Sequence, residues 1–460
     1  MSDLEAALEY ARTRTEAFKR DLIDLVRIPS VSTDPARAAD MGRAAAWCAE
    51  RLRALGFQNV AALPTARHPV VYGEHLGAGP GAPTVLFYDH YDVQPAEPLQ
   101  EWTSPPFEPT QRGDNLYARG VSDSKGQLVA HLKAVEALVQ TNRGRLPVNL
   151  KYMLEGEEEI GSPSLPGFLK DNRERLRCDF CLNGDSGILA PDQPAIMYAL
   201  RGLSYFEIRV QGPQRDLHSG LFGGAVQNPA EVLAKLLAGM KDANGRVTLP
   251  GFYDDVRELS EAERADLAKL PQPDAWWLEQ TGAPKLFGEA GYTSVERASA
   301  RPTLEVNGLL SGFTGEGSKT VLPSRAMAKV SMRLVADQEP AKIQAGLERY
   351  LKEHAPPTVK WELLTFADAR PSLLERDSRE ARAAAEALKA VWGKPALFMR
   401  QGGTIPAVAQ IEEALGVKSL LLGFGLPDDN LHAPNEKLHL PTFFRGIETH
   451  LRFLATVGRS

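Results

Sequence analysis

Cysteine is scarce in this sequence, with three residues, Cys48, Cys178 and Cys181, in a chain of 460. So small and odd a number excludes the disulfide framework of a small secreted domain, and it fits a reducing, cytoplasmic compartment. The spacing Cys178-x-x-Cys181 is that of half a structural zinc site, but no second pair follows to complete it. We therefore interpret both cysteines as small residues of a strand.

The sequence also lacks long apolar runs, a leader pattern and clustered positive charge. No apolar run approaches the roughly 20 residues that span a bilayer, and the first thirty residues carry acidic side chains where a signal peptide has basic and apolar ones. Lysine and arginine number 53 against 59 aspartate and glutamate residues, with no basic block to bind phosphate groups. We expect an unprocessed cytoplasmic protein with neither a membrane nor a nucleic acid as partner.

The chain has enough apolar content for a large core, since 43% of its residues are hydrophobic and 24% are charged. Its length corresponds to about two to three domains. In the first 200 residues, short apolar runs alternate with amphipathic helical patterns. The runs lie at 69–72, 84–88, 148–154 and 180–182. This alternation predicts an α/β layered domain with a mostly parallel sheet.

The pattern changes near Arg201. Residues 204–210 and 329–335 alternate between polar and apolar, which is typical of a half-exposed sheet, and between them lies a proline-rich excursion, 249–302, with a capping box at Ser260 and Glu263. From about residue 377 the helical and apolar patterns return. We therefore predict an α/β domain formed by residues 1–202 and 375–460, interrupted by an inserted α+β domain at 203–374.

Polar residues directly after buried strands mark the place where α/β proteins bind ligands. His90 and Asp92 follow the run 84–88, and in an extended chain two residues apart they point the same way, which suits an imidazole ligand with a carboxylate beside it. A plain surface loop is the alternative. Asp123 lies in a turn that leads into a helix, so it either caps that helix or points into the same crevice as His90.

Four carboxylates in five positions, at residues 155, 157, 158 and 159, follow the apolar run 148–154. They repel one another unless a divalent cation compensates them or the loop is fully solvated. Asp185 and His432 follow two further strands. This mixed set of histidines and carboxylates is typical of catalytic zinc, cobalt or manganese sites, and differs from the closed sites of structural zinc.

Six motifs, taken in order, resemble the co-catalytic metallopeptidase family of aminoacylases, glutamate carboxypeptidases and carnosinase-type dipeptidases. They are His90-x-Asp92, Gly-Val-Ser-Asp123-Ser-Lys-Gly, Glu158-Glu159-Ile-Gly-Ser, Asp185, Asp216-Leu-His218-Ser-Gly and His432. The segments around Thr320, Arg333 and Gly403-Thr404 also match the cytosolic non-specific dipeptidase branch. That branch usually has serine in place of Thr404, a departure that keeps the hydroxyl group.

The resemblance implies a zinc-exopeptidase-like fold with an inserted lid or dimerisation domain, and two divalent metal ions per subunit. Zinc is the expected metal, with manganese or cobalt as alternatives. The ligands that it implies are His90 and Asp185 for one ion, Glu159 and His432 for the other, and Asp123 as the bridge. Asp92 then acts beside His90, and Glu158 is the general base.

The activity that the resemblance implies is hydrolysis of dipeptides or short peptides with a free C-terminal carboxylate by a metal-bridging hydroxide. The implied substrate-binding residues are His218, Thr320, Arg333, Gly403 and Thr404. Arg333 would bind the carboxylate, and His218 would stabilise the oxyanion from the partner subunit of a homodimer. A deacylase of N-acyl amino acids on the same fold, and a catalytically silent binding protein, are the alternatives.

Overall fold

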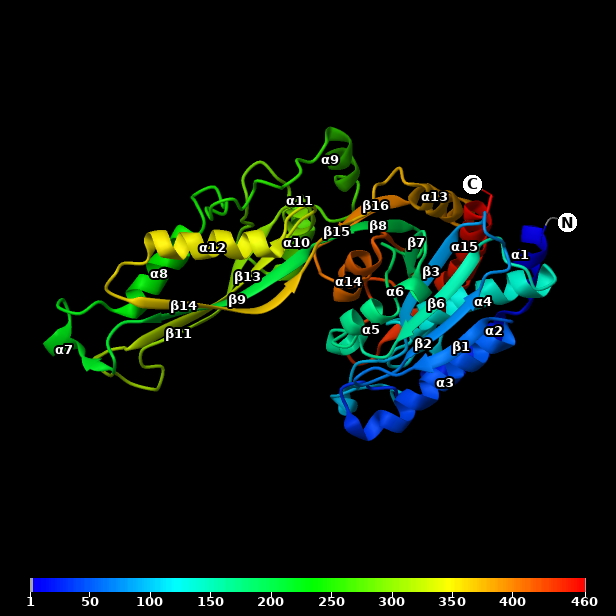
Figure 1. Cartoon of the computed structure of the whole chain (residues 1–460), viewed down its shortest axis with the longest axis horizontal. Helices are drawn as coiled ribbons and strands as arrows, with labels where there is room; N and C mark the ends of the chain where they lie inside the picture. The colour runs from blue at the N-terminus through cyan, green and yellow to red at the C-terminus, as the bar shows by residue number, and fades with distance from the viewer. Residues whose placement is uncertain (1–2, 460) are drawn as a thin grey trace. The chain divides into compact units, whose positions relative to one another are not determined.

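The computed structural model describes residues 3–459 and divides into two compact units (Figure 1). The first unit consists of Met1–Tyr198, Leu374–Met399 and Pro406–Ser460, and the second of Ala199–Leu373 and Arg400–Ile405. The second unit is thus inserted into the first, as the predicted fold class requires. The hexapeptide Arg400–Ile405 returns to the second unit, a feature that the division predicted from the sequence does not contain.

A nine-stranded mixed sheet lies at the centre of the first unit, in the order β1-β2-β6-β3-β7-β17-β8-β15 with β16 beside β8. The strands are β1 (Gln58–Leu63), β2 (Val70–His75), β3 (Thr84–His90), β6 (Asn149–Glu155), β7 (Phe180–Asn183), β8 (Ala195–Leu200), β15 (Ser372–Leu373), β16 (Leu397–Gln401) and β17 (Ser419–Leu421).

The prediction of a mostly parallel sheet holds for its centre, where β6, β3, β7 and β17 are parallel neighbours. Towards the edges, β1, β2 and β8 pair in antiparallel fashion. The short connection between β1 and β2 explains this at one edge, because parallel neighbours need a crossover of a dozen or more residues.

Helices cover this sheet, and every residue of β6 is buried. The helices are α1 (Asp3–Thr13), α2 (Thr15–Val26), α3 (Ala38–Ala54), α4 (Lys125–Thr141), α5 (Leu165–Asp171), α6 (Arg173–Leu176), α13 (Arg379–Trp392), α14 (Pro406–Leu415) and α15 (Leu440–Val457). Helices α1 and α2 are separated at Arg14, whose backbone leaves the helical region. Helix α4 packs against α1 and α15, so the turn before it is anchored in the core.

A small antiparallel sheet lies beside these elements. Its strands are β4 (Thr110–Arg112), β5 (Asn115–Tyr117) and β18 (Lys437–His439), in the order β18-β5-β4. Three 3-10 helices complete the unit: η1 (Pro35–Arg37), η2 (Leu99–Glu101) and η3 (Glu158–Ile160). Strand β18 therefore joins the segment after His432 to the segment before Asp123.

The second unit has its own hydrophobic core, formed by a four-stranded antiparallel sheet in the order β11-β13-β9-β14 under two helices. The strands are β9 (Gly202–Gln211), β11 (Thr303–Ser311), β13 (Arg325–Leu334) and β14 (Lys360–Ala369), and the covering helices are α8 (Pro229–Gly239) and α12 (Pro340–His354). Every second residue of β13 is buried, because one sheet face packs on these helices while the other stays open.

Smaller elements of the second unit flank this sheet. They are β10 (Leu217–His218), β12 (Val321–Leu322), α7 (Ser219–Phe222), α9 (Glu261–Leu267), α10 (Asp274–Thr281) and α11 (Ser294–Ser299). The predicted capping box is present, since the side chains of Ser260 and Glu263 each accept the other's backbone N–H at the start of α9.

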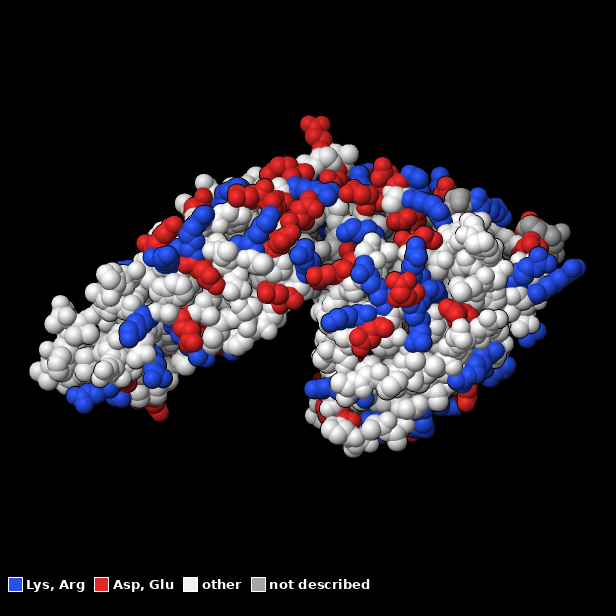
Figure 2. Space-filling model, viewed as in Figure 1, with Lys and Arg blue, Asp and Glu red and all other residues white. Residues whose placement is uncertain are grey.

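The surface mixes both signs of charge. On the face drawn in Figure 2, blue and red side chains are interspersed over each unit, without a continuous basic area of the kind that binds phosphate groups. Across residues 3–459, none of the helices combines the length and apolarity that crossing a bilayer requires.

Candidate metal centre and active site

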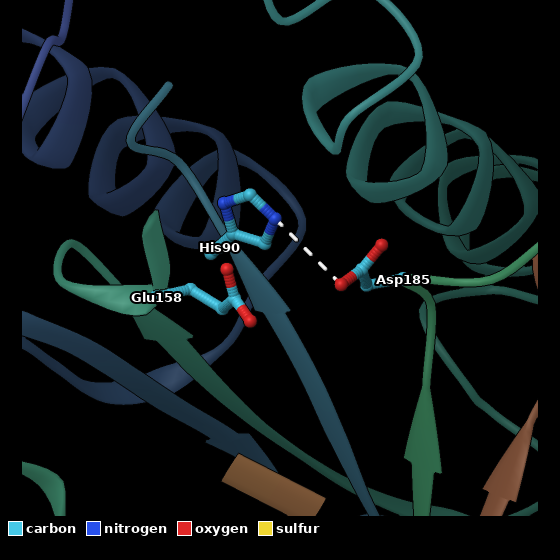
Figure 3. Close-up of side chains that lie close together, drawn as sticks. All are labelled: His90, Glu158 and Asp185. Atoms are coloured by element: carbon cyan, nitrogen blue, oxygen red, sulfur yellow. Dashed lines mark ion pairs between the residues drawn. The ribbon is translucent and has the colours of Figure 1, made fainter. Parts of the chain in front are cut away.

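His90 is the last residue of β3 and is fully buried. Its Nδ1 lies 3.0 Å from the backbone oxygen of Asp92. Since a carbonyl oxygen only accepts, Nδ1 carries a proton, and Nε2 is the nitrogen that can bind a cation once the ring is neutral. Nε2 lies 3.1 Å from Asp123 Oδ1 and 3.9 Å from Asp185 Oδ2, a contact drawn in Figure 3.

Asp123 lies between the two histidines predicted as ligands. Its Oδ1 faces His90, and its Oδ2 lies 3.1 Å from Nε2 of His432. Ser124 is the residue at the N-cap of α4, and no side chain caps this helix. The alternative that Asp123 closes the helix start is therefore not realised, and the carboxylate spans two donor groups instead.

The three consecutive glutamates have different surroundings. Glu157 is buried and accepts hydrogen bonds from Thr65 and from the backbone of His68 and Ser164. It therefore connects its own loop to the segment that contains Thr65 and His68. Glu158 points toward His90 and Asp185 (Figure 3), and its carboxylate has no hydrogen-bond partner among residues 3–459.

Glu159 lies on the other side of the site, with its Oε2 3.2 Å from Nε2 of His432. Asp92 positions this loop, because its two carboxylate oxygens accept the backbone N–H groups of Glu158 and Glu159 at 3.3 and 3.1 Å. One carboxylate thus stands beside His90 and also holds both glutamates in place.

These side chains form two clusters, His90 with Glu158 and Asp185, and Asp123 with Glu159 and His432, in each of which the ligand atoms lie within 4.8 Å of one another. Within the described part of the chain, no lysine or arginine forms an ion pair with any of these carboxylates. The two imidazoles are their only partners of basic character, so the clusters have the donor chemistry and the unbalanced charge that divalent cations require.

The pKa values reflect this crowding. Burial, followed by the charge of Asp123, raises the pKa of Asp185 to about 7. Burial also raises the pKa of Glu158. Hydrogen bonds to Asp123 and Glu159 raise the pKa of His432 to about 10. Without a cation these groups hold extra protons, which divalent ions replace on binding, because metal ligands must be deprotonated.

Two buried carboxylates that the sequence analysis did not select hold the ligand loops together. Glu436 Oε2 accepts from Arg119 Nη1 and from the backbone N–H of Gly120, each at 2.8 Å, and its Oε1 accepts from the N–H groups of Ser122 and Asp123 at 3.0 and 3.1 Å. Glu436 therefore ties the loop that carries Asp123 to its own loop, which carries His432.

Asp429 adds to this connection, since it accepts from the hydroxyl of Ser122 at 2.6 Å and from the backbone N–H of Leu426 at 2.8 Å. Asp89, the neighbour of His90 in β3, accepts hydrogen bonds from the hydroxyl of Ser124 and from the backbone N–H of His90. A Cβ atom at residue 184 would lie 2.2 Å from Oδ2 of Asp89, so any other residue at Gly184 would displace this carboxylate.

The substrate-binding residues predicted in the second unit fall into two groups. His218 and Thr320 lie together in the β10–β12 ribbon, where His218 is paired with Val321 and the N–H of Ser219 donates to the backbone oxygen of Thr320. Both side chains are exposed, and Nδ1 of His218 accepts from the N–H of Gly220 at 3.0 Å.

Arg333, Gly403 and Thr404 form the second group, at the other end of the sheet. Arg333 Nη1 donates to Thr404 Oγ1 at 2.6 Å, and that hydroxyl donates to the backbone oxygen of Arg201 at 2.6 Å. The hexapeptide Arg400–Ile405 brings Thr404 to Arg333 although 70 residues separate them in the chain, which no local sequence pattern indicates.

Comparison with known proteins agrees with this geometry. Residues 86–456 match the description "Peptidase family M20/M25/M40". The chain belongs to this family. The Cys-Gly metallodipeptidase dug1 of Schizosaccharomyces pombe is 31% identical over 479 aligned residues, covering 99% of each protein.

Two solved structures extend the likeness. The M20 family metallo-carboxypeptidase Sso-CP2 from Sulfolobus solfataricus has a TM-score of 0.80 at 33% identity, covering 96% of this chain and 99% of that one. Human carnosine dipeptidase 1 has a TM-score of 0.75 at 29% identity, covering 100% of both chains. The predicted fold class and the resemblance to carnosinase-type dipeptidases are thereby confirmed.

Membership of the family makes the chain a hydrolase of peptide bonds that uses divalent metal ions, and the two ligand clusters fit a two-ion site. Metallodipeptidases among its relatives favour peptide hydrolysis over the deacylase alternative. The predicted peptidase activity is confirmed to this extent.

Proposed function

We propose that the protein hydrolyses dipeptides with a free C-terminal carboxylate, and that Glu158 moves the proton in this metal-dependent reaction. One observation carries the proposal: Asp123 contacts both histidines, which links the two clusters of ligand atoms, and the carboxylate of Glu158 lies within 4.8 Å of His90 and Asp185 without a hydrogen bond among residues 3–459. A purely structural metal site would have no use for such a carboxylate. The alternative of a silent binding protein is disfavoured for the same reason.

The ligands in this proposal are His90 and Asp185 for one ion, Glu159 and His432 for the other, and Asp123 for both. Bound divalent ions supply Lewis acidity, which acidifies a water molecule and polarises the peptide carbonyl. Glu158 takes the proton of the attacking water and passes it to the leaving amine. Burial suits this role, because a raised pKa lets the carboxyl hold a proton at neutral pH between the two transfers.

Asp92 acts as a positioning residue. Its contacts with His90 and with the N–H groups of Glu158 and Glu159 fix one ligand and the base relative to each other. Because a catalytic base must lie within hydrogen-bond reach of the proton it takes, loss of this carboxylate should affect turnover as well as metal binding.

Arg333 is the proposed receptor for the substrate carboxylate. Its guanidinium forms no ion pair with a carboxylate of the described chain, and one of its N–H groups is fixed by Thr404, which leaves a planar donor edge for a bidentate contact. Gly403, which precedes Thr404 in the same segment, is proposed as part of this substrate-binding group.

A homodimer is proposed because His218 and Arg333 cannot serve one small substrate from the same unit. Strand β13 spans about 27 Å from Arg325 to Arg333. Arg333 pairs with Thr303, which follows α11. His218, in contrast, leads into α7. Figure 1 shows α7 and α11 at opposite ends of the second unit. If His218 and Arg333 both contact one dipeptide, then His218 and its neighbour Thr320 reach that dipeptide from the partner subunit.

The surface supports a second copy as partner. Strand β11 is an unpaired edge of its sheet, with Leu309 62% and Leu310 54% exposed, and Leu221 of α7 is 75% exposed. Edge strands with apolar side chains are usually covered in native proteins.

Zinc is the proposed metal, since its donor preferences match this set of histidines and carboxylates. A cytoplasmic location is proposed from the three free cysteines.

The test is hydrolysis by chelator-treated protein supplied with Zn²⁺, Mn²⁺ or Co²⁺ in turn. Ala-Gly, Cys-Gly and β-Ala-His would be compared with Ala-Gly-Gly and N-acetyl-alanine, with Arg333→Met as the variant. We expect dipeptide cleavage that returns only with metal, and a KM at least about tenfold higher in the variant. Cleavage of N-acetyl-alanine alone, or none with any metal, would contradict the proposal.

A further inference from the structure

The second unit contains a cavity of about 540 Å³ beside Arg333. Its walls come from the open face of β11 and β13, from α11 and from the loop before α11. Its volume lies in the range of roughly 300–1,000 Å³ that small-molecule sites occupy. All the residues that line the cavity belong to the second unit, so it exists independently of the metal centre.

The charges on its walls do not balance. Five lining residues are cationic, namely Arg201, Lys241, Arg297, Arg301 and Arg333, and two are acidic, Glu289 and Glu305. The acidic pair is already engaged, since Glu289 binds Arg301 with two contacts of 2.8 Å and Glu305 lies 3.3 Å from Lys241. Three arginines therefore face the cavity as surplus positive charge.

None of these three arginines forms an ion pair with a carboxylate within residues 3–459. Arg201 donates from Nε to the backbone oxygen of Gly402 at 2.9 Å, and Arg297 donates from Nε to the backbone oxygen of Glu289 at 2.8 Å. Carbonyl oxygens fix the orientation of the two side chains without neutralising them. Burial, followed by the charge of Arg333, lowers the pKa of Arg201 to about 10, which reflects the cost of burying this cation beside a second one.

We propose that this cavity binds the side-chain carboxylate of an acidic C-terminal residue, so that the enzyme prefers dipeptides ending in glutamate or aspartate. The inference rests on the proposed function, in which Arg333 binds the α-carboxylate. Arg297 then binds the second carboxylate, and Arg201 adds positive charge behind it. A substrate end with two negative charges compensates the three arginines far better than a neutral residue does.

The test compares kcat/KM for Ala-Glu with that for Ala-Gln, which has nearly the same shape and lacks the charge. We expect kcat/KM to be about tenfold higher for Ala-Glu than for Ala-Gln. This ratio should fall towards one in Arg297→Gln and should be retained in part in Arg297→Lys. Ser331→Asp, which adds a carboxylate to the cavity wall, should lower the preference as well and remains available if Arg297→Gln does not fold. Arg349→Gln, on the exposed side of α12, is the matched control.

Binding of glutarate to the metal-free protein provides a second readout that needs no peptidase activity. Calorimetry should show glutarate binding, no binding of neutral glutaramide, and at least fivefold weaker binding in Arg297→Gln. If no dipeptide is cleaved, the proposed function fails while this measurement still decides the cavity. An Ala-Glu to Ala-Gln ratio near one, or glutarate binding that ignores the Arg297 substitution, would overturn the inference.

Discussion

Replacing Glu436 with glutamine should weaken metal binding although Glu436 is not itself a ligand. The carboxylate accepts four hydrogen bonds, three from backbone N–H groups and one from Arg119, and it is completely buried. Glutamine offers one oxygen and one NH₂ group, so the NH₂ must face two donors. Each buried donor left unpaired costs about 1–3 kcal/mol, and loss of the buried ion pair with Arg119 raises the total to about 3–5 kcal/mol.

Part of this cost falls on the metal site, because two of the affected bonds hold the backbone of Ser122 and Asp123. Removing such supporting contacts typically lowers metal affinity by about 10–100-fold. Calorimetric titration of the chelator-treated Glu436→Gln protein with Zn²⁺ should show this loss, and a urea titration should show the reduced stability of the first unit.

Glu296→Gln is the matched control for this experiment. Glu296 is also a buried carboxylate that accepts from an arginine, Arg264, and from a backbone N–H, but it lies in the second unit. It should destabilise the protein and leave Zn²⁺ affinity unchanged. If Glu436→Gln binds Zn²⁺ as tightly as the unaltered protein, the assigned role of Glu436 is refuted.

Three further results are expected. Glu158→Gln should bind the usual amount of metal while its turnover falls by about 10²–10⁴-fold, and near-normal turnover would remove Glu158 as the base. Mixing inactive His218→Ala with inactive Glu158→Gln subunits should restore part of the activity after verified exchange, whereas none would return if His218 acts within its own chain. Burial lowers the pKa of His450 to about 3, below its ordinary 6.5, so the free energy of unfolding should fall as the pH drops from about 6.5 towards 3. The urea midpoint measured against pH should show this fall, and His450→Phe should reduce it. An unchanged pH dependence in the variant would exclude His450 as the cause.

The clustering of the proposed ligands could be predicted because each follows a strand or turn whose pattern is visible in the sequence. His90 ends the buried strand β3, and Asp185 comes two residues after β7, at neighbouring carboxyl ends of a parallel sheet. The resemblance implies Glu158 as the base, and the structure engages its neighbour Glu157 in hydrogen bonds from Thr65, His68 and Ser164.

Other features depend on contacts that a local pattern does not contain. Glu436 bonds to backbone groups more than 300 residues earlier in the chain, so its role became visible only when β18 and β5 were paired. The surplus of arginines around the cavity likewise combines positions 201, 297 and 333, which are dispersed in the sequence. Periodicity can indicate which residues are buried, but it cannot indicate which of them remain without a counter-charge.

The return of Arg400–Ile405 to the second unit has a consequence for how this protein can be re-engineered. The chain passes between the two units four times, after residues 198, 373, 399 and 405. In a chimera that takes only Ala199–Leu373 from a relative, the residue at position 333 comes from the relative and Thr404 comes from the host. Two groups that share a 2.6 Å hydrogen bond in this protein then come from different parents. The proposed substrate receptor is therefore encoded by two distant stretches of the chain, and recombination transfers it intact only when both stretches move together.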